Sequence, residues 1–212
     1  MKICFFDLET TDKNPVGAEI LTGFFKVVEN DRSIDLFDLK VKPDVWKEDA
    51  AKIHKITRTQ AESFPSREYA LRRLYSFIKK HSDAYFCCHA NANLYGRSGH
   101  FDWTVLSSNF AFLSPEAYYA LNELRVRVVS THTMAKKLLK TDSYSLESLA
   151  NYFGYQYAAH DAQNDVEAMI HVFKQLTQKL PQKYDLYDLG HYSGNQRYDK
   201  FRIDQNFLPM EF

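Results

Sequence analysis

Two carboxylates near the start of the chain are the first candidates for chemistry. Asp7 and Glu9 follow an apolar run, Ile3 to Phe6, and one residue separates them. Side chains at positions i and i+2 share one face of a strand, so the two carboxylates would lie close together and raise each other's pKa unless a cation sits between them. The pair indicates either a divalent metal site or, in the plainer alternative, two solvated acids at the end of a surface strand.

Two further segments carry candidate residues. Asp161 is suited to be the N-cap of a predicted helix, which leaves His160 in the preceding loop and turns Asp165 towards whatever faces this end of the helix. Asp102 lies between two aromatic residues that are expected to face the core, and a carboxylate is costly to bury there unless it is paired or bound to a metal. The plainer alternative is that Asp102 and Asp165 complement helix dipoles and that His160 is a solvated loop residue.

The elements that would position these residues alternate in the manner of an α/β domain. The first three strand candidates follow one another with short polar breaks, the clearest being Asn30-Asp31-Arg32, which predicts an antiparallel meander. Two later strands would complete a mixed sheet in parallel orientation. The expected strands cover residues 2–7, 19–29, 34–42, 84–88 and 126–130.

Helical periodicity and capping residues predict the helices that flank this sheet. Ser114, followed by Pro115 and Glu116, reads as the start of one helix, and Ser145 caps another that Gly154 ends. The expected helices cover residues 66–81, 101–112, 114–125, 145–154 and 161–178.

Composition limits the classes of protein that fit. The 212 residues, 45% of them hydrophobic, allow one substantial core. The chain has 27 Lys and Arg residues against 27 Asp and Glu residues, so its net charge is zero. We therefore expect any interface with nucleic acid to be short or metal-mediated. Cys4, Cys87 and Cys88 lie in apolar runs rather than at disulfide or zinc spacings, and no signal peptide or membrane-length apolar stretch is seen. We expect a soluble protein in the reducing cytoplasm, with no membrane partner.

Taken in order, the candidate segments resemble the motifs of the DnaQ-like, or DEDDh, 3′-to-5′ exonucleases, whose fold is ribonuclease H-like. The resemblance covers about residues 1–178, with support from segments 53–57, 130–135 and 144–149. The sister group has a tyrosine four residues before its last aspartate, where this chain has Asp161, so the histidine subclass fits. The first motif resembles Asp7-Leu8-Glu9-Thr10-Thr11, the second Phe101-Asp102, and the third His160 five residues before Asp165.

The resemblance implies a catalytic centre with two Mg²⁺ or Mn²⁺ ions. It implies that Asp7 bridges both ions, that Glu9 and Asp165 hold the ion carrying the nucleophilic water, and that Asp102 serves the second ion. His160 would be the general base, because a neutral imidazole takes a proton near pH 7 without a large pKa shift. The products would be nucleoside 5′-monophosphates.

The resemblance also suggests contacts with the substrate, and the sequence departs from the family pattern at two places. A segment at 94–100, resembling an inserted loop, separates the His-Asn pair of the family from the second motif, and it either touches substrate or only covers the surface. Lys55 stands where the family commonly has glycine. The expected substrate-binding residues are Thr10, Thr11, His54, Asn91 and Phe101.

The sequence thus predicts an exonuclease domain over residues 1–180, acting on 3′ ends of single-stranded DNA or RNA. The aromatic-rich tail at 181–212 is expected to pack on this domain or on a partner chain. A homodimer and a polymerase or replication partner both stay open, as does the choice between DNA and RNA. The alternative from another class is a non-catalytic nucleic-acid-binding or polymerase-associated module that retains the fold.

Overall fold

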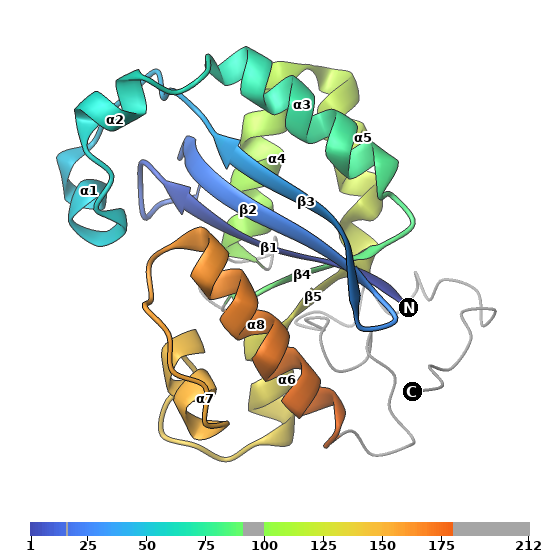
Figure 1. Cartoon of the computed structure of the whole chain (residues 1–212). Coiled ribbons are helices and arrows are strands. Elements are labelled where there is room, and N and C mark those ends of the chain that lie inside the picture. The colour runs from blue at the N-terminus through green and yellow to red at the C-terminus, as the bar shows by residue number, and fades with distance from the viewer. Residues whose placement is uncertain (16, 91–99, 180–212) are drawn as a thin grey trace.

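A five-stranded mixed sheet forms the centre of the computed structural model, which describes residues 1–15, 17–90 and 100–179 (Figure 1). The strands are β1 (Lys2–Thr10), β2 (Ile20–Glu29), β3 (Arg32–Lys40), β4 (Tyr85–Cys88) and β5 (Val128–Ser130), in the order β3-β2-β1-β4-β5. The pairs β1–β2 and β2–β3 are antiparallel, and the pairs β1–β4 and β4–β5 are parallel. The predicted mixed sheet, with its three-stranded meander, is confirmed.

Helices cover both faces of the sheet (Figure 1). On one face, α3 and α4 pack against the sheet and α5 packs on α4, whereas α8 packs against β1 and β2 on the other face, together with α6 and α7. Every helix within the described ranges is too short or too polar to cross a membrane. The helices are α1 (Glu48–His54), α2 (Arg58–Glu62), α3 (Arg67–Lys80), α4 (Phe101–Leu113), α5 (Pro115–Glu123), α6 (Thr131–Leu138), α7 (Leu146–Tyr152) and α8 (Ala162–Thr177), with a 3₁₀ helix at Leu124–Arg127.

The central strand β1 explains why the first two carboxylates point to one side. Because side chains alternate along a strand, its odd-numbered residues share one face. Ile3 and Phe5 belong to the hydrophobic cluster beneath α8, and Asp7 and Glu9 continue their row where the strand leaves the core. The opposite row belongs to the second cluster and comprises Cys4, Phe6 and Leu8.

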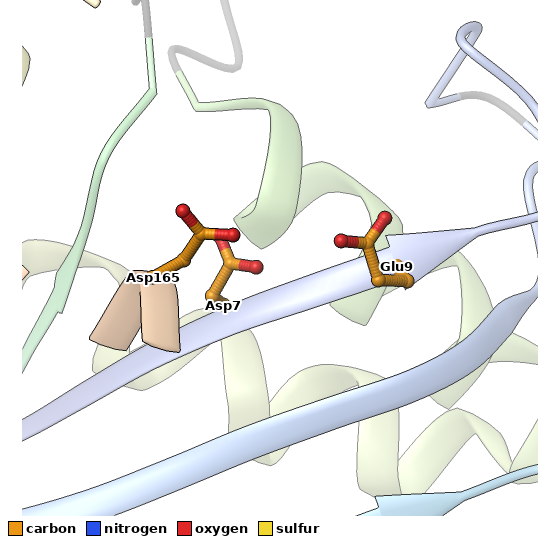
Figure 2. Close-up of side chains that lie close together, drawn as sticks. All are labelled: Asp7, Glu9 and Asp165. Carbon is orange, nitrogen blue, oxygen red and sulfur yellow. The ribbon is translucent and has the colours of Figure 1, made fainter. Parts of the chain in front are cut away.

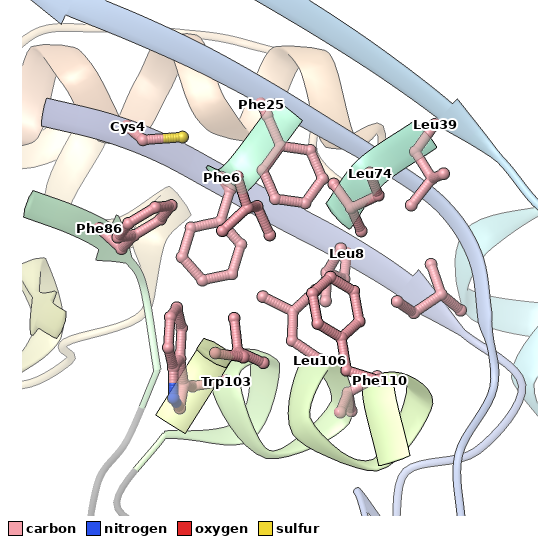
Figure 3. Packing of buried hydrophobic residues seen from close by; sticks show 14 of the residues in the cluster. Cys4, Phe6, Leu8, Phe25, Leu39, Leu74, Phe86, Trp103, Leu106 and Phe110 are labelled. Atoms are coloured by element: carbon pink, nitrogen blue, oxygen red, sulfur yellow. The ribbon is translucent and has the colours of Figure 1, made fainter. Parts of the chain in front are cut away.

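The second cluster fixes α4 against the sheet (Figure 3). The ring of Phe6 stacks on Phe25 with centroids 5.4 Å apart, and its edge meets Trp103 of α4 at 6.2 Å. Trp103 also contacts the ring of Phe86 on β4 at 5.6 Å. Since Asp102 precedes Trp103 in the first turn of α4, this aromatic packing sets the place of its carboxylate.

Local turn and cap chemistry confirms several predicted boundaries. Asn30 and Asp31 have φ angles of 48° and 64° and form the two-residue connection between β2 and β3, which is the backbone that a tight hairpin turn requires. Ser114, Ser145 and Asp161 each accept a backbone N–H at a helix start.

Other predicted boundaries are wrong or untested. β3 begins two residues before the predicted position, and β5 begins two residues after it because the 3₁₀ helix occupies the preceding residues. Helices α1 and α2 were not predicted. The predicted tail at 181–212, and positions 94–99 of the predicted loop, lie outside the described residues.

Candidate metal centre

Three carboxylates from two elements lie close together beside the sheet, with Asp7 next to Asp165 and Glu9 further along the strand (Figure 2). Asp7 and Glu9 come from β1, and Asp165 comes from the first turn of α8, which packs against that strand. One carboxylate oxygen from each residue lies within 4.8 Å of the other two. The face shared by Asp7 and Glu9 is therefore completed by a residue more than 150 positions further along the chain.

The carboxylates of this cluster repel one another. Burial, followed by the negative charges of Asp102 and Asp165, raises the pKa of Asp7 well above its ordinary value. Burial and then the charges of Asp165 and Asp102 raise the pKa of Glu9 to about 7. Among the described residues, the charges that shift the pKa values of Asp7 and Glu9 most are all carboxylates, which repel rather than compensate these two groups.

Asp102 is the fourth carboxylate of this region. It is buried in the first turn of α4, and its charge is the largest electrostatic contribution to the raised pKa of Asp7. Burial, with a further contribution from Asp165, raises the pKa of Asp102 itself to about 7. The structure thus places Asp102 within electrostatic reach of the other three, although it does not belong to the group whose oxygens lie within 4.8 Å.

The donor set fits a hard divalent cation. Uncompensated carboxylate oxygens are the ligands that Mg²⁺ and Mn²⁺ prefer, and a bound cation would remove the repulsion that raises these pKa values. A zinc site would instead favour histidine or cysteine ligands. The three cysteines, all buried and unpaired, lie in the hydrophobic clusters.

Asp165 also accepts two hydrogen bonds from the loop before α8. The hydroxyl of Tyr157 donates to Oδ1 at 2.8 Å, and the backbone N–H of His160 donates to Oδ2 at 3.0 Å. His160 has a φ of 67°, in the left-handed region, and its side chain is exposed. Tyr157 was not predicted from the sequence, because no motif spacing distinguishes it from the nearby Tyr155.

A cavity of about 450 Å³ extends from Glu9, at one side of the carboxylate cluster, to helices α1 and α2. Glu9, His160 and His54 all line it. His54 is buried, its Nδ1 accepts the backbone N–H of Ile56 at 3.0 Å, and its Nε2 has no hydrogen-bond partner among the described residues. Since Nδ1 is the acceptor, Nε2 carries the proton, and this N–H is buried without a hydrogen-bond partner among the described residues.

The backbone next to His54 accounts for one departure from the family pattern. Lys55 has a φ of 57°, the left-handed conformation that glycine adopts without strain. It follows the last residue of α1, and its N–H bonds to the carbonyl of Ala51. The chain therefore keeps, with a lysine, the conformation for which the family commonly uses glycine.

The other predicted substrate residues have different surroundings. The hydroxyl of Thr10 donates to the carbonyl of Asp12, and the hydroxyl of Thr11 accepts the N–H of Glu19, so both side chains make bonds within the loop after β1. Phe101 is partly buried at the start of α4. Asn91 lies outside the described residues.

Comparison with solved structures shows the same fold in exonuclease I of E. coli. Its complex with a dT13 oligonucleotide has a TM-score of 0.70 and 18% identity over 84% of this chain and 41% of that chain. Its zinc-bound complex with single-stranded DNA has a TM-score of 0.71 and 19% identity over 85% and 41%, respectively. This chain spans about two fifths of the length of exonuclease I, and the likeness confirms the predicted ribonuclease H-like fold.

The sequence itself identifies the family. No curated protein gives a significant match. The family model RNase_T, described as exonuclease, matches residues 4–173, which is more than half of the chain. The matched region contains all the residues on which the DEDDh resemblance depends: Asp7, Glu9, Asp102, His160 and Asp165. The chain belongs to the RNase_T exonuclease family, as its resemblance to the DEDDh 3′-to-5′ exonucleases predicts.

Proposed function

We propose that this protein is a metal-dependent 3′-to-5′ exonuclease that releases nucleoside 5′-monophosphates. The observation that carries the proposal is the group formed by Asp7, Glu9 and Asp165, whose oxygens lie within 4.8 Å of one another. Asp102 adds a fourth charge nearby. A non-catalytic module would have no use for carboxylates that repel one another, because their repulsion costs stability unless a cation binds.

We propose that these four carboxylates hold two Mg²⁺ or Mn²⁺ ions. Bound ions would stabilise the charge that develops on the scissile phosphate and lower the pKa of a bound water. The protein's own contribution is to hold its ligands in place: β1 fixes Asp7 and Glu9, the aromatic packing of α4 fixes Asp102, and the first turn of α8 fixes Asp165.

His160 is the proposed general base. It lines the same cavity as Glu9, and its backbone is held by the carboxylate of Asp165. Its exposed imidazole is free to accept the proton that the attacking water loses. Replacing it by alanine should lower kcat by roughly 10²- to 10⁴-fold, the usual contribution of a general base.

The substrate is proposed to enter the cavity between the carboxylates and α1. His54, which lines this cavity, remains a proposed substrate contact, as do Thr10, Thr11, Asn91 and Phe101. Single-stranded DNA is the favoured substrate, because exonuclease I of E. coli has been crystallised with it. RNA is the second candidate, since these contacts do not report on a 2′-hydroxyl.

We further propose that residues 1–180 form the exonuclease domain and that the tail at 181–212 contacts this domain or a partner. We also propose that the protein is cytoplasmic. The three unpaired cysteines fit a reducing compartment. A protein partner is supported by the complex of exonuclease I with SSB-Ct, which has a TM-score of 0.71 and 18% identity over 88% of this chain and 42% of that chain. A homodimer or a polymerase is an alternative partner.

The test is digestion of matched 5′-labelled DNA and RNA strands, single- and double-stranded, with Mg²⁺, Mn²⁺ or EDTA. We expect a ladder that shortens from the 3′ end, release of 5′-mononucleotides, and complete loss of activity with EDTA. Asp7→Asn should abolish the activity. Strands that stay intact with both metals, but are bound by the protein, would instead establish the non-catalytic module.

A further inference from the structure

Asp165 has both of its carboxylate oxygens engaged by one short loop. In the described part of the chain, Tyr157 Oη donates to Oδ1 at 2.8 Å and His160 N donates to Oδ2 at 3.0 Å. Each carboxylate oxygen offers about two lone pairs, so these two bonds leave acceptor sites for a cation while removing the freedom of the carboxyl group to rotate. The orientation of Asp165 is therefore set by partners outside its own helix.

The tyrosine donor is held by aromatic packing between its loop and α8. Its ring lies against that of Tyr155, with centroids 6.1 Å apart, and Tyr155 in turn stacks on His171 of α8 at 4.9 Å. The Nε2 atom of His171 is 3.2 Å from the carbonyl oxygen of Phe153, a hydrogen bond between α8 and the end of α7. This stack ties the loop to the same helix that carries Asp165, so hydroxyl and carboxylate are fixed in one unit.

The loop also begins at a fixed point. Gly154, with a φ of 76°, closes α7 in a Schellman motif, in which the N–H of Tyr155 bonds to the carbonyl of Ala150 and that of Gly154 to Asn151. The loop then ends at Asp161, the N-cap of α8. With both ends held, the hydroxyl of Tyr157 is preorganised to meet Asp165 rather than recruited when a ligand arrives.

We propose that Tyr157 is a positioning residue that fixes the carboxylate of Asp165 for divalent cation binding. The inference rests on the proposed function, because it takes Asp165 as a metal ligand. Hydrogen-bond partners that orient a ligating carboxylate typically contribute 10- to 100-fold in metal affinity. Tyr157 touches neither substrate nor the reacting atoms in this role, and it acts only through Asp165.

The test compares Tyr157→Phe with Tyr155→Phe, which removes a hydroxyl from the same aromatic stack without removing a donor to Asp165. Mn²⁺ alone is titrated into each metal-free protein by calorimetry, without substrate. We expect Tyr157→Phe to bind Mn²⁺ roughly 10- to 100-fold more weakly and to need correspondingly more Mn²⁺ for half-maximal cleavage, with most of kcat recovered at saturating Mn²⁺. Tyr155→Phe should bind Mn²⁺ as the wild type does.

Two results would overturn the inference: unchanged Mn²⁺ affinity in Tyr157→Phe, or an equal loss in both variants, which would indicate a general effect on the loop. Asp165→Asn separates this inference from the proposed function. If Asp165→Asn abolishes Mn²⁺ binding while Tyr157→Phe does not weaken it, only the positioning role fails. If Asp165→Asn abolishes and Tyr157→Phe weakens Mn²⁺ binding but the wild type degrades no nucleic acid, only the proposed function fails.

Discussion

Asp7 is the residue at which stability and proposed function conflict most clearly. Burial and then the neighbouring carboxylates raise its pKa, so ionising it in the metal-free protein costs free energy. The same carboxylate is the proposed ligand shared by both ions. A residue that destabilises the free fold and is required for cation binding is the pattern expected of a functional site rather than of a solvated strand end.

We expect Asp7→Asn to stabilise the metal-free protein and to abolish nuclease activity. Removing one charge from the cluster at pH 8 should raise the free energy of unfolding by about 1–2 kcal/mol, which is a rise of about 2–8 °C in Tm for a domain of this size. Thermal denaturation in EDTA measures the change. Asp142→Asn, at an exposed position, is the control and should change Tm little. An unchanged or lower Tm for Asp7→Asn would contradict mutual repulsion in the cluster.

At the scale of single elements, the start of α8 does most to assemble the site. Asp161 accepts the N–H of Asn164 at 3.0 Å and so begins the helix, which places Asp165 in its first turn. His160, just before this cap, has the left-handed backbone that turns the chain into the helix. One cap therefore determines the position of a proposed metal ligand and of the proposed base.

We expect Asp161→Ala to lower the free energy of unfolding by about 0.5–2 kcal/mol, because the first turn of α8 loses its side-chain acceptor. Nuclease activity should fall as well, since both Asp165 and His160 depend on that turn. Asp161→Ser keeps an acceptor oxygen and should retain most of the stability. Urea denaturation and turnover on a labelled strand measure the two effects. Equal destabilisation by serine and alanine would show that the cap bond is not the cause.

How well the sequence predicts an element depends on whether local or long-range interactions determine it. Asp161 as N-cap and Gly154 as helix end are local signals, and both are confirmed. Helix α2 was missed although Thr57 and Gln60 form a capping box, because its five residues are too few to show periodicity. Tyr157 was missed for a different reason. Its partner Asp165 is brought to it only by the packing of the loop on α8, which no local pattern records.

At the scale of the whole molecule, several titratable groups make stability depend on pH, and they do not all act in the same direction. Burial, followed by the charge of His132, lowers the pKa of His89 to about 3. As pH falls below about 6.5, this histidine is protonated in the unfolded chain but not in the folded protein, so its contribution to stability is lost. Hydrogen bonds from Lys80 and His81 lower the pKa of Asp35 to about 2, and its contribution is lost only in stronger acid, as pH falls through that value.

The carboxylate cluster acts with the opposite sign. The pKa values of Glu9 and Asp102 are about 7 in the metal-free fold, above their ordinary values of 4.5 and 3.8. Between those limits the folded protein holds protons that the unfolded chain has released. The contribution of these two residues to the free energy of unfolding is therefore fully present below pH 4 and is lost as pH rises through about 7. Because His89 opposes this trend, the total stability of the protein does not isolate the cluster.

The difference in Tm with and without Mn²⁺ does isolate it, because His89 and Asp35 titrate alike in both samples. Cations must displace the protons held by Glu9 and Asp102 at pH 5.5, but they meet mostly ionised carboxylates at pH 8. We therefore expect Mn²⁺ to raise Tm strongly at pH 8 and little at pH 5.5, with the change centred near pH 7. In Asp7→Asn the Mn²⁺ effect should be small at every pH. A Mn²⁺ effect of equal size at pH 5.5 and pH 8 would mean that the bound ions do not compete with protons at these carboxylates, and the proposed metal centre would then have to lie elsewhere.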